Sequence, residues 1–254
     1  MLAIERSTRR PGWALFRDAD CVRQSDGGED LARAPAWLAR LGEAIAADGI
    51  PLASIDCLAI GLGPGSFSGI RAAIATGQGL ALPGGCTLTG VSSAAALAWA
   101  ERARREEGRD LFHLSRKVGS RASPATAGGE PVAVVGDARR NRLWCAIYAR
   151  DPDTGRLCAL TDGRLRTPTH TAEDFALVDW DGLAALIPAD ARVLSPDWDR
   201  IGDRLSAVIP ADRLVAGVRV PTAADVGRLV LADPGAACLD PMPIYLQPAV
   251  AEER

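Results

Sequence analysis

The residues best suited to chemistry lie in a glycine-rich turn at positions 63–71, which reads Gly63-Pro64-Gly65-Ser66-Phe67-Ser68-Gly69-Ile70-Arg71. An apolar segment at 55–62 precedes this turn, and a run of small residues at 72–82 follows it. This order predicts a strand, a sharp turn and a helix, with Ser66 or Ser68 as the helix cap. Free backbone N–H groups at such a helix start can bind a phosphate group.

The spacing of the glycines argues against the two familiar nucleotide loops. The G-x-x-x-x-G-K-[ST] loop requires a lysine where this sequence has Ile70, and the spacing from Gly63 to Gly69 is one residue too long. The G-x-G-x-x-G pattern also fails, because Ser68 occupies the position of its last glycine. We therefore interpret the turn as architectural and keep phosphate binding as the alternative.

Two acidic residues follow apolar segments in similar contexts. Glu5 follows Leu2-Ala3-Ile4, and Asp137 follows the apolar segment 132–136. Each acid leads into an arginine-rich turn, and an aromatic residue, Trp13 or Trp144, opens the next segment. The shared order predicts two similar hairpins, which are either a coincidence or an internal repeat.

Cysteine and histidine give no sign of a metal centre. The six cysteines include no C-x-x-C pair and read as free, buried thiols. The two histidines, His113 and His170, are far apart and share no ligand spacing with each other or with a cysteine.

Two helices are expected to flank the glycine turn. In the helix at 31–47, Leu31, Leu38 and Leu41 lie on the core stripe and Trp37 lies beside it, either at the edge of the core or at an interface. In the second helix an apolar stripe comprises Ile70, Ala73, Ile74, Gly77, Leu80 and Ala81. Its remaining positions carry Ala72, Ala75, Thr76 and Gly79, although a glycine inside a helix costs about 1 kcal/mol relative to alanine. The helix is therefore buried on both sides within its own domain, or its second face binds another subunit.

Composition limits the function further. The 254 residues suit two modest domains or one large one, and 48% of them are hydrophobic. A net charge of −3 disfavours strong nucleic-acid binding by this chain alone. No apolar run reaches the ~18 residues that a membrane span needs, and Glu5 and Arg6 interrupt the start of the chain. We expect a cytoplasmic protein.

The glycine segment carries a family resemblance. Gly63 to Arg71, with Gly77-Gln78-Gly79-Leu80-Ala81, resembles the signature of the TsaB (YeaZ) family. Further matches occur in the same order along the chain, at Leu2-Ala3-Ile4, at Asp137-Ala138-Arg139 with Leu143-Trp144, and at Pro243-Ile244-Tyr245-Leu246. The resemblance implies an α/β fold of the duplicated actin-like ATPase (ASKHA, ribonuclease H-like) type, with two mixed-sheet domains and flanking helices. We expect domains at 1–106 and 131–254, a linker or insertion at 107–130, and a helix at 222–233 that packs on the first domain.

The same resemblance implies a function without catalysis. Members of the family are dimerisation partners of the transferase TsaD in threonylcarbamoyladenosine modification of tRNA, with TsaE as the ATPase of a larger complex. It implies a pseudoenzyme that forms a heterodimer with TsaD, forms a homodimer when alone, contacts tRNA mainly through its partners and needs no cofactor. Active actin-like ATPases place small residues after both acids, whereas Arg6 and Arg139–Arg140 stand here and suggest salt-bridged turns. The alternatives are an active actin-like kinase or ATPase, a peptidase, and a free-standing homodimeric binding protein.

No catalytic, cofactor-binding or metal residue is predicted, and the sequence does not support a nucleotide at the boundary with TsaD. The predicted partner interface comprises Leu31, Trp37, Leu38, Leu41, Ile70, Ala73, Ile74, Gly77 and Leu80. The predicted motif turn comprises Gly63, Pro64, Gly65, Ser66, Phe67, Ser68, Gly69 and Arg71.

Overall fold

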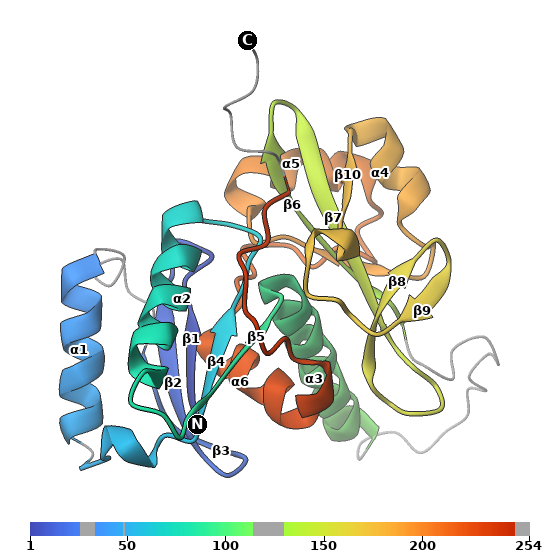
Figure 1. Cartoon of the computed structure of the whole chain (residues 1–254). Helices are drawn as coiled ribbons and strands as arrows, with labels where there is room; N and C mark the ends of the chain where they lie inside the picture. The colour runs from blue at the N-terminus through green and yellow to red at the C-terminus, as the bar shows by residue number, and fades with distance from the viewer. Residues whose placement is uncertain (26–33, 48, 114–129, 247–254) are drawn as a thin grey trace. The chain divides into compact units, whose positions relative to one another are not determined.

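The computed structural model describes residues 1–25, 34–47, 49–113 and 130–246. These residues form two compact units, each built on one mixed β-sheet (Figure 1). Unit 1 takes its residues from 1–96, 169–173 and 220–254, and unit 2 takes its residues from 97–168 and 174–219. The expected linker at 107–130 lies largely outside the described residues, and the predicted domain limits stay a prediction. No helix in the described ranges is long and apolar enough to cross a membrane.

Unit 1 contains a five-stranded sheet in the order β3-β2-β1-β4-β5. Its strands are β1 (Leu2–Glu5), β2 (Gly12–Arg17), β3 (Asp20–Gln24), β4 (Cys57–Gly61) and β5 (Thr87–Val91). The first three strands pair antiparallel, whereas β4 pairs parallel to both β1 and β5. Its helices are α1 (Ala34–Ala47), α2 (Phe67–Ala81) and α6 (Ala223–Ala232), with short 3-10 turns at Leu52–Ser54 and Pro234–Ala236.

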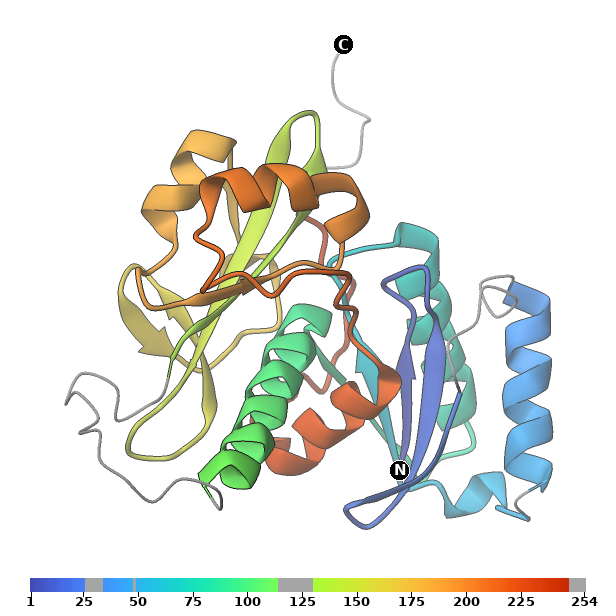
Figure 2. The same ribbon diagram turned by 180° about the vertical axis from the view of Figure 1, so that it is seen from behind.

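Helices α2 and α6 cover opposite faces of this sheet (Figures 1 and 2). The strand register places Leu2, Ile4 and Ile60 on the face that α2 covers, and the small side chains of Ala3, Ala14 and Ala59 on the other face. Each helix approaches the sheet closely through a glycine. A Cβ at Gly77 would lie 2.8 Å from Leu88, and a Cβ at Gly227 would lie 2.3 Å from the ring of Phe16. Each of these large side chains on a strand therefore packs against a helix residue that has no side chain.

Unit 2 contains a six-stranded sheet in the order β11-β6-β7-β8-β9, with β10 paired to β7. Its strands are β6 (Val132–Arg139), β7 (Arg142–Arg150), β8 (Leu157–Thr161), β9 (Arg164–Arg166), β10 (Ala176–Val178) and β11 (Arg192–Leu194). Helices α4 (Trp180–Leu186) and α5 (Trp198–Val208) pack on the sheet, and their core includes Val135, Leu143, Leu183 and Leu205. The boundary between the units falls inside α3 (Ser93–His113), and the 3-10 turn Ala172–Asp174 completes the described elements.

The two sheets repeat one pattern. In each, an antiparallel hairpin (β1–β2 or β6–β7) is followed by a third antiparallel strand, and a parallel strand (β4 or β11) lies beside the first strand and leads into a helix. The predicted repeat of the hairpin is therefore confirmed. In unit 2, residues 176–178 form a short strand, and Leu214 pairs with Val193 through an isolated bridge.

Candidate functional site

The glycine-rich turn is packed against the backbone that follows β1. Ser66 caps α2 by accepting a hydrogen bond from the N–H of Gly69 at 3.2 Å, as predicted. A Cβ at Gly65 would lie 2.0 Å from the carbonyl oxygen of Ser7, and a Cβ at Gly69 would lie 2.1 Å from that of Arg6. These two glycines are therefore required by close backbone packing, which favours the architectural interpretation of the turn.

The acid of the first hairpin is buried beneath this turn. Glu5 is fully buried and accepts hydrogen bonds from the N–H of Ser7 at 2.5 Å and from the Oγ of Ser93 at 2.6 Å. The same Ser93 Oγ accepts a hydrogen bond from the N–H of Gly63 at 3.0 Å. Burial raises the pKa of Glu5, and the hydrogen bonds from Ser7 and Ser93 act in the opposite direction. Glu5 thus links β1, the glycine turn and the start of α3.

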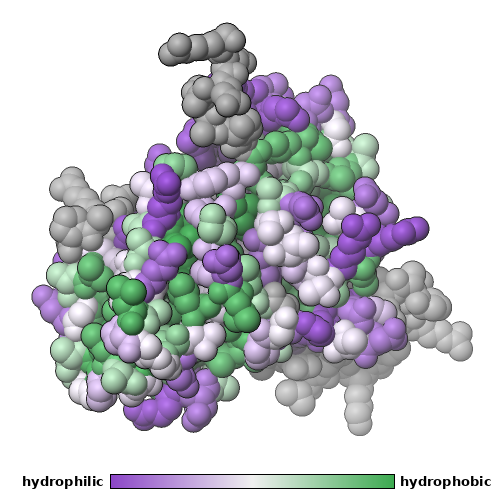
Figure 3. Space-filling view, in the orientation of Figure 1, coloured by the Kyte–Doolittle hydropathy of each residue, from purple (hydrophilic) through white to green (hydrophobic). Residues whose placement is uncertain are grey.

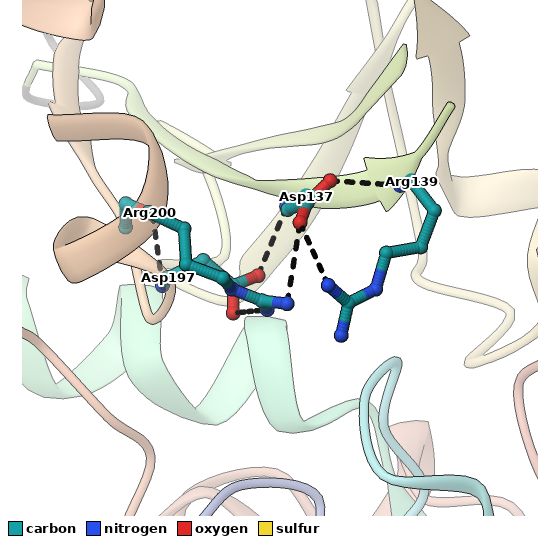
Figure 4. A network of polar contacts seen from close by, with 5 residues as sticks. Asp137, Arg139, Asp197 and Arg200 are labelled. Atoms are coloured by element: carbon teal, nitrogen blue, oxygen red, sulfur yellow. Dashed lines mark hydrogen bonds and ion pairs between the residues drawn. The ribbon is translucent and has the colours of Figure 1, made fainter. Parts of the chain in front are cut away.

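The acid of the second hairpin lies in a network of ion pairs, which Figure 4 shows. Asp137 Oδ2 is 3.2 Å from Nη1 of Arg200 and 3.4 Å from Nη1 of Arg139. The N–H of Asp137 donates to Asp197 Oδ2 at 2.9 Å, and Asp197 also pairs with Arg200. The N–H of Asp197 in turn donates to Ser195 Oγ at 3.0 Å.

The predicted salt-bridged turn is found in the second hairpin, and the acid of the first hairpin is satisfied differently. Asp137 pairs with arginine, but Glu5 is satisfied by hydroxyl and backbone donors. Arg6 instead lies with its guanidinium carbon 4.6 Å above the ring of Trp37. The physical reason is burial: an ion pair at the site of Glu5 would need a second desolvated charge, whereas short neutral donors satisfy it at a lower desolvation cost.

The remaining titratable candidates serve the packing of each unit. His170 is buried, and its Nδ1 accepts a hydrogen bond from the N–H of Ser92 at 3.1 Å. All six cysteines are free, yet only Cys145 and Cys158 are buried, so the expectation of six buried thiols was too broad. Burial raises the pKa of Cys145 to about 12. Among the described residues, no group of three or more His, Cys, Asp or Glu could hold a metal ion.

The inward face of α2 holds most of the interface that was predicted for this helix. Ile70, Ala73, Ile74 and Gly77 are buried in the core of unit 1, and only Leu80 is partly exposed. These four residues pack on the chain's own sheet, so they do not form a surface that a partner can contact. The apolar stripe identified the helix correctly, but it marked the core face instead of an interface.

The outward face of α2, which we call the α2 outer face, is exposed and combines two small residues with two long polar ones; it comprises Arg71, Ala75, Gln78 and Gly79. A Cβ at Gly79 would find no atom within 4 Å. Leu82, at the end of the helix, has an exposed fraction of 84%. Hydrophobic residues, coloured green in Figure 3, gather over the region of α1 and α2.

Helix α1 presents a similar surface. Trp37, Leu41 and Ile45 are buried, whereas Leu38 is 50% exposed and Gly42 has open space around it. The predicted core stripe is therefore confirmed at Leu41 and wrong at Leu38, because the neighbouring Trp37 is buried in place of Leu38. Of the predicted interface residues on this helix, Leu38 alone is exposed among those described; Leu31 lies outside the described residues.

An aromatic pair beside the glycine turn was missed by the sequence reasoning. The rings of Phe67 and Tyr245 stack with centroids 5.1 Å apart, and the Arg71 guanidinium carbon lies 4.7 Å above Phe67. Both aromatic residues stood in segments that carried the family resemblance. Their contact could not be inferred because it joins two segments that lie far apart in the sequence.

Comparisons with known proteins complete the description. Residues 37–111 match the family described as TsaD: tRNA N6-adenosine threonylcarbamoyltransferase. The fold resembles a crystal structure described as an uncharacterized protein with similarity to peptidase YEAZ from Pseudomonas aeruginosa, with a TM-score of 0.67 and 25% identity, covering 97% of this chain and 98% of that one. A structure of YeaZ from Pseudomonas aeruginosa gives a TM-score of 0.66 and 24% identity, with 96% and 98% covered. No curated protein matches the sequence.

These resemblances and the two repeated mixed sheets confirm the predicted fold class. The chain has an actin-like fold of the ASKHA type, with helices that flank each sheet.

Proposed function

We propose that the chain is a member of the YeaZ (TsaB) family, which it resembles in fold, and that it acts in tRNA modification as the non-catalytic partner of a TsaD-type transferase. In this proposal TsaD transfers the threonylcarbamoyl group from its adenylate to the adenosine next to the anticodon. TsaE supplies ATPase turnover in a larger complex. The present chain contributes a binding surface instead of reactive groups, and tRNA is held mainly by the partners.

The observation that supports this proposal most is the α2 outer face. Between the long polar side chains of Arg71 and Gln78, the exposed Ala75 and Gly79 leave the backbone of α2 accessible. Small residues allow a second helix to approach closely, which increases the contact area between them. Burying apolar surface stabilises such a contact by about 25 cal/mol per Å², before the cost of association is subtracted.

Helix α1 extends the same surface. Leu38 is half exposed, and the exposed Ala39, Gly42 and Ala46 lie near it on the helix. Both helices belong to unit 1 and run in similar directions in Figures 1 and 2. We propose that TsaD binds these two outward faces with a helix pair of its own. The inward residues Trp37, Leu41, Ile70 and Ile74 then support the interface from below.

The two acids fit a role without catalysis. In an active ATPase of this fold, acids in both hairpins would face Mg²⁺ and phosphate. Here Glu5 is buried under the glycine turn, and Asp137 is paired with two arginines. Binding of Mg²⁺ at either acid would require these internal contacts to break first.

The test places one large charged side chain on the α2 outer face. Ala75→Arg and Gly79→Arg are expected to weaken binding to TsaD by at least about 30-fold, which corresponds to a loss of about 2 kcal/mol. The fold should stay intact, because Ala75 is exposed and Gly79 has open space. The measurement is binding to purified TsaD by co-elution and calorimetry, with thermal unfolding of each variant alone.

Two control variants complete the design. Ala207→Arg makes the same change at an exposed alanine of α5 in unit 2 and should bind TsaD normally. Gly77→Leu forces a side chain against Leu88 and Ile60, so it should lower the stability of the isolated chain. Normal TsaD binding by both outer-face variants would contradict the proposal. Loss of self-association alone would favour a free-standing homodimer.

A further inference from the structure

The tip of the β6–β7 hairpin gathers positive charge that the proposed docking surface does not use. We call it the arginine tip, and it comprises Arg139, Arg140 and Arg142 of the hairpin with Arg200 and Arg204 of α5. Figures 1 and 2 show the hairpin extending past the other strands of its sheet. The three hairpin arginines are exposed.

The backbone at the arginine tip has a conformation that most residues with a side chain adopt only with strain. Arg139, Arg140 and Asn141 have φ angles of +67°, +52° and +60°, which lie in the left-handed region. Arg140 and Asn141 form the two-residue turn, and Arg139 is the last, bulged residue of β6. Glycine or asparagine is preferred at positions with a positive φ, because other residues with a Cβ are disfavoured there. Two arginines occupy positions that asparagine or glycine would fill with less strain. This cost suggests that their guanidinium groups have a use.

Only part of the charge is balanced within unit 2. Asp137 and Asp197 pair with Arg139 and Arg200. Within the described residues Arg140, Arg142 and Arg204 make no ion pair. Arg142 donates to the carbonyl oxygen of Leu177 at 3.0 Å.

Arg204 is held in place by neutral groups. It donates to Asn141 Oδ1 at 2.8 Å, and its guanidinium carbon lies 4.2 Å above the ring of Trp180. The exposed Asp199 and Asp203 form a neighbouring row on α5, about 100° around the helix from Arg200 and Arg204. The side of α5 that meets the hairpin is therefore basic.

We propose that the arginine tip contacts the phosphodiester backbone of RNA, as an auxiliary contact to a tRNA held by the complex. Guanidinium groups bind phosphate oxygens through paired N–H donors, and such contacts need charge but little apolar area. The tip offers no exposed apolar residue between 139 and 142, so it does not resemble the core of a protein interface. The inference rests on the proposed role in tRNA modification for the identity of its ligand.

The test removes the charges of Arg139 and Arg140 and relieves the backbone strain at these two positions. The double variant Arg139→Asn, Arg140→Gly places at both positions a residue that adopts a positive φ with less strain than arginine, so its melting temperature should stay equal to that of the wild type or rise. The control Arg164→Ala, Arg166→Ala removes the same charge from the exposed edge strand β9 of the same sheet. Each protein is assembled with TsaD, and binding of an unmodified tRNA is measured over a range of salt concentrations.

We expect the tip variant to bind TsaD normally but to bind tRNA about tenfold more weakly, with a log–log salt slope that is smaller by about 1 to 2. The β9 control should match the wild type in both measurements. Equal tRNA binding by the tip variant and the control would overturn the proposal. Weaker TsaD binding with unchanged tRNA binding would also overturn it, and would indicate an acidic protein partner. If the wild-type chain forms no complex with TsaD, the proposed function fails, and the same comparison on the chain alone then decides the role of the tip.

Discussion

The two hairpins of the duplicated fold use the same topological position in different ways. In unit 1, Glu5 is fully buried and fastens the glycine turn through Ser7 and Ser93. In unit 2, Asp137 lies near the surface and is bound by Arg139 and Arg200. Both acids bind groups of the chain itself. Buried Glu5 accepts hydrogen bonds from neutral donors, and Asp137 forms ion pairs with arginines near the surface. The comparison teaches that an acid can lose access to an external ligand by burial or by ion pairing.

The largest loss of stability is expected from substituting the glycines that let the glycine turn pack above Glu5. A Cβ at Gly65 would lie 2.0 Å from Ser7 O, and the backbone there has a φ of +156°. Gly65→Ala should therefore lower the free energy of unfolding by about 3 kcal/mol or more. Gly42→Ala in α1 is the control, because open space surrounds Gly42 and alanine favours the helix. Urea denaturation measures both, and equal stability of the two variants would break the comparison.

A smaller difference is expected between the two acids. Glu5→Gln replaces an acceptor oxygen in the buried network by a donor, so the variant should lose about 2 kcal/mol of stability. Asp137→Asn changes a partly exposed acid and should lose about 0.5 to 1 kcal/mol. The measurement is urea denaturation at one pH for both variants. An equal or larger loss in Asp137→Asn would show that burial does not separate the two hairpins.

The smallest expected effect is a pH dependence of the free energy of unfolding that arises from Glu5. Burial raises the pKa of Glu5 above its ordinary value of 4.5, so the folded state favours the protonated form. This contribution to stability is fully present below pH 4.5 and is lost as the pH rises through the raised value. Glu5→Gln should remove that part of the pH profile of unfolding, whereas Asp137→Asn should retain it. Parallel pH profiles for the wild type and Glu5→Gln would contradict the assignment.

The sequence was sufficient for the features that depend on local patterns. It predicted the strand, turn and helix around positions 63–71, the cap at Ser66 and the repeat of the two hairpins. It did not predict which face of α2 is exposed. Periodicity locates an apolar stripe, but the stripe at Ile70 and Ile74 packs equally well on the chain's own sheet or on a partner.

The other missed features are tertiary contacts. Trp37 and Leu38 are adjacent, and the buried indole contacts Arg6 while the leucine is exposed, a difference that their positions in the sequence do not predict. Asp197 joins the Asp137 network because β11 pairs with β6 and α5 begins at the end of β11. Such pairings depend on the order of strands in the sheet, which no local pattern reports.

The central claim is that the chain contributes a binding surface and leaves the chemistry to its partner. The most direct test is the mass in solution of the purified chain mixed with TsaD, measured by light scattering. The account predicts a species with the combined mass of both proteins, which disappears when the chain carries Gly79→Arg. Two separate species with the wild-type chain, or an equally stable complex with Gly79→Arg, would contradict it.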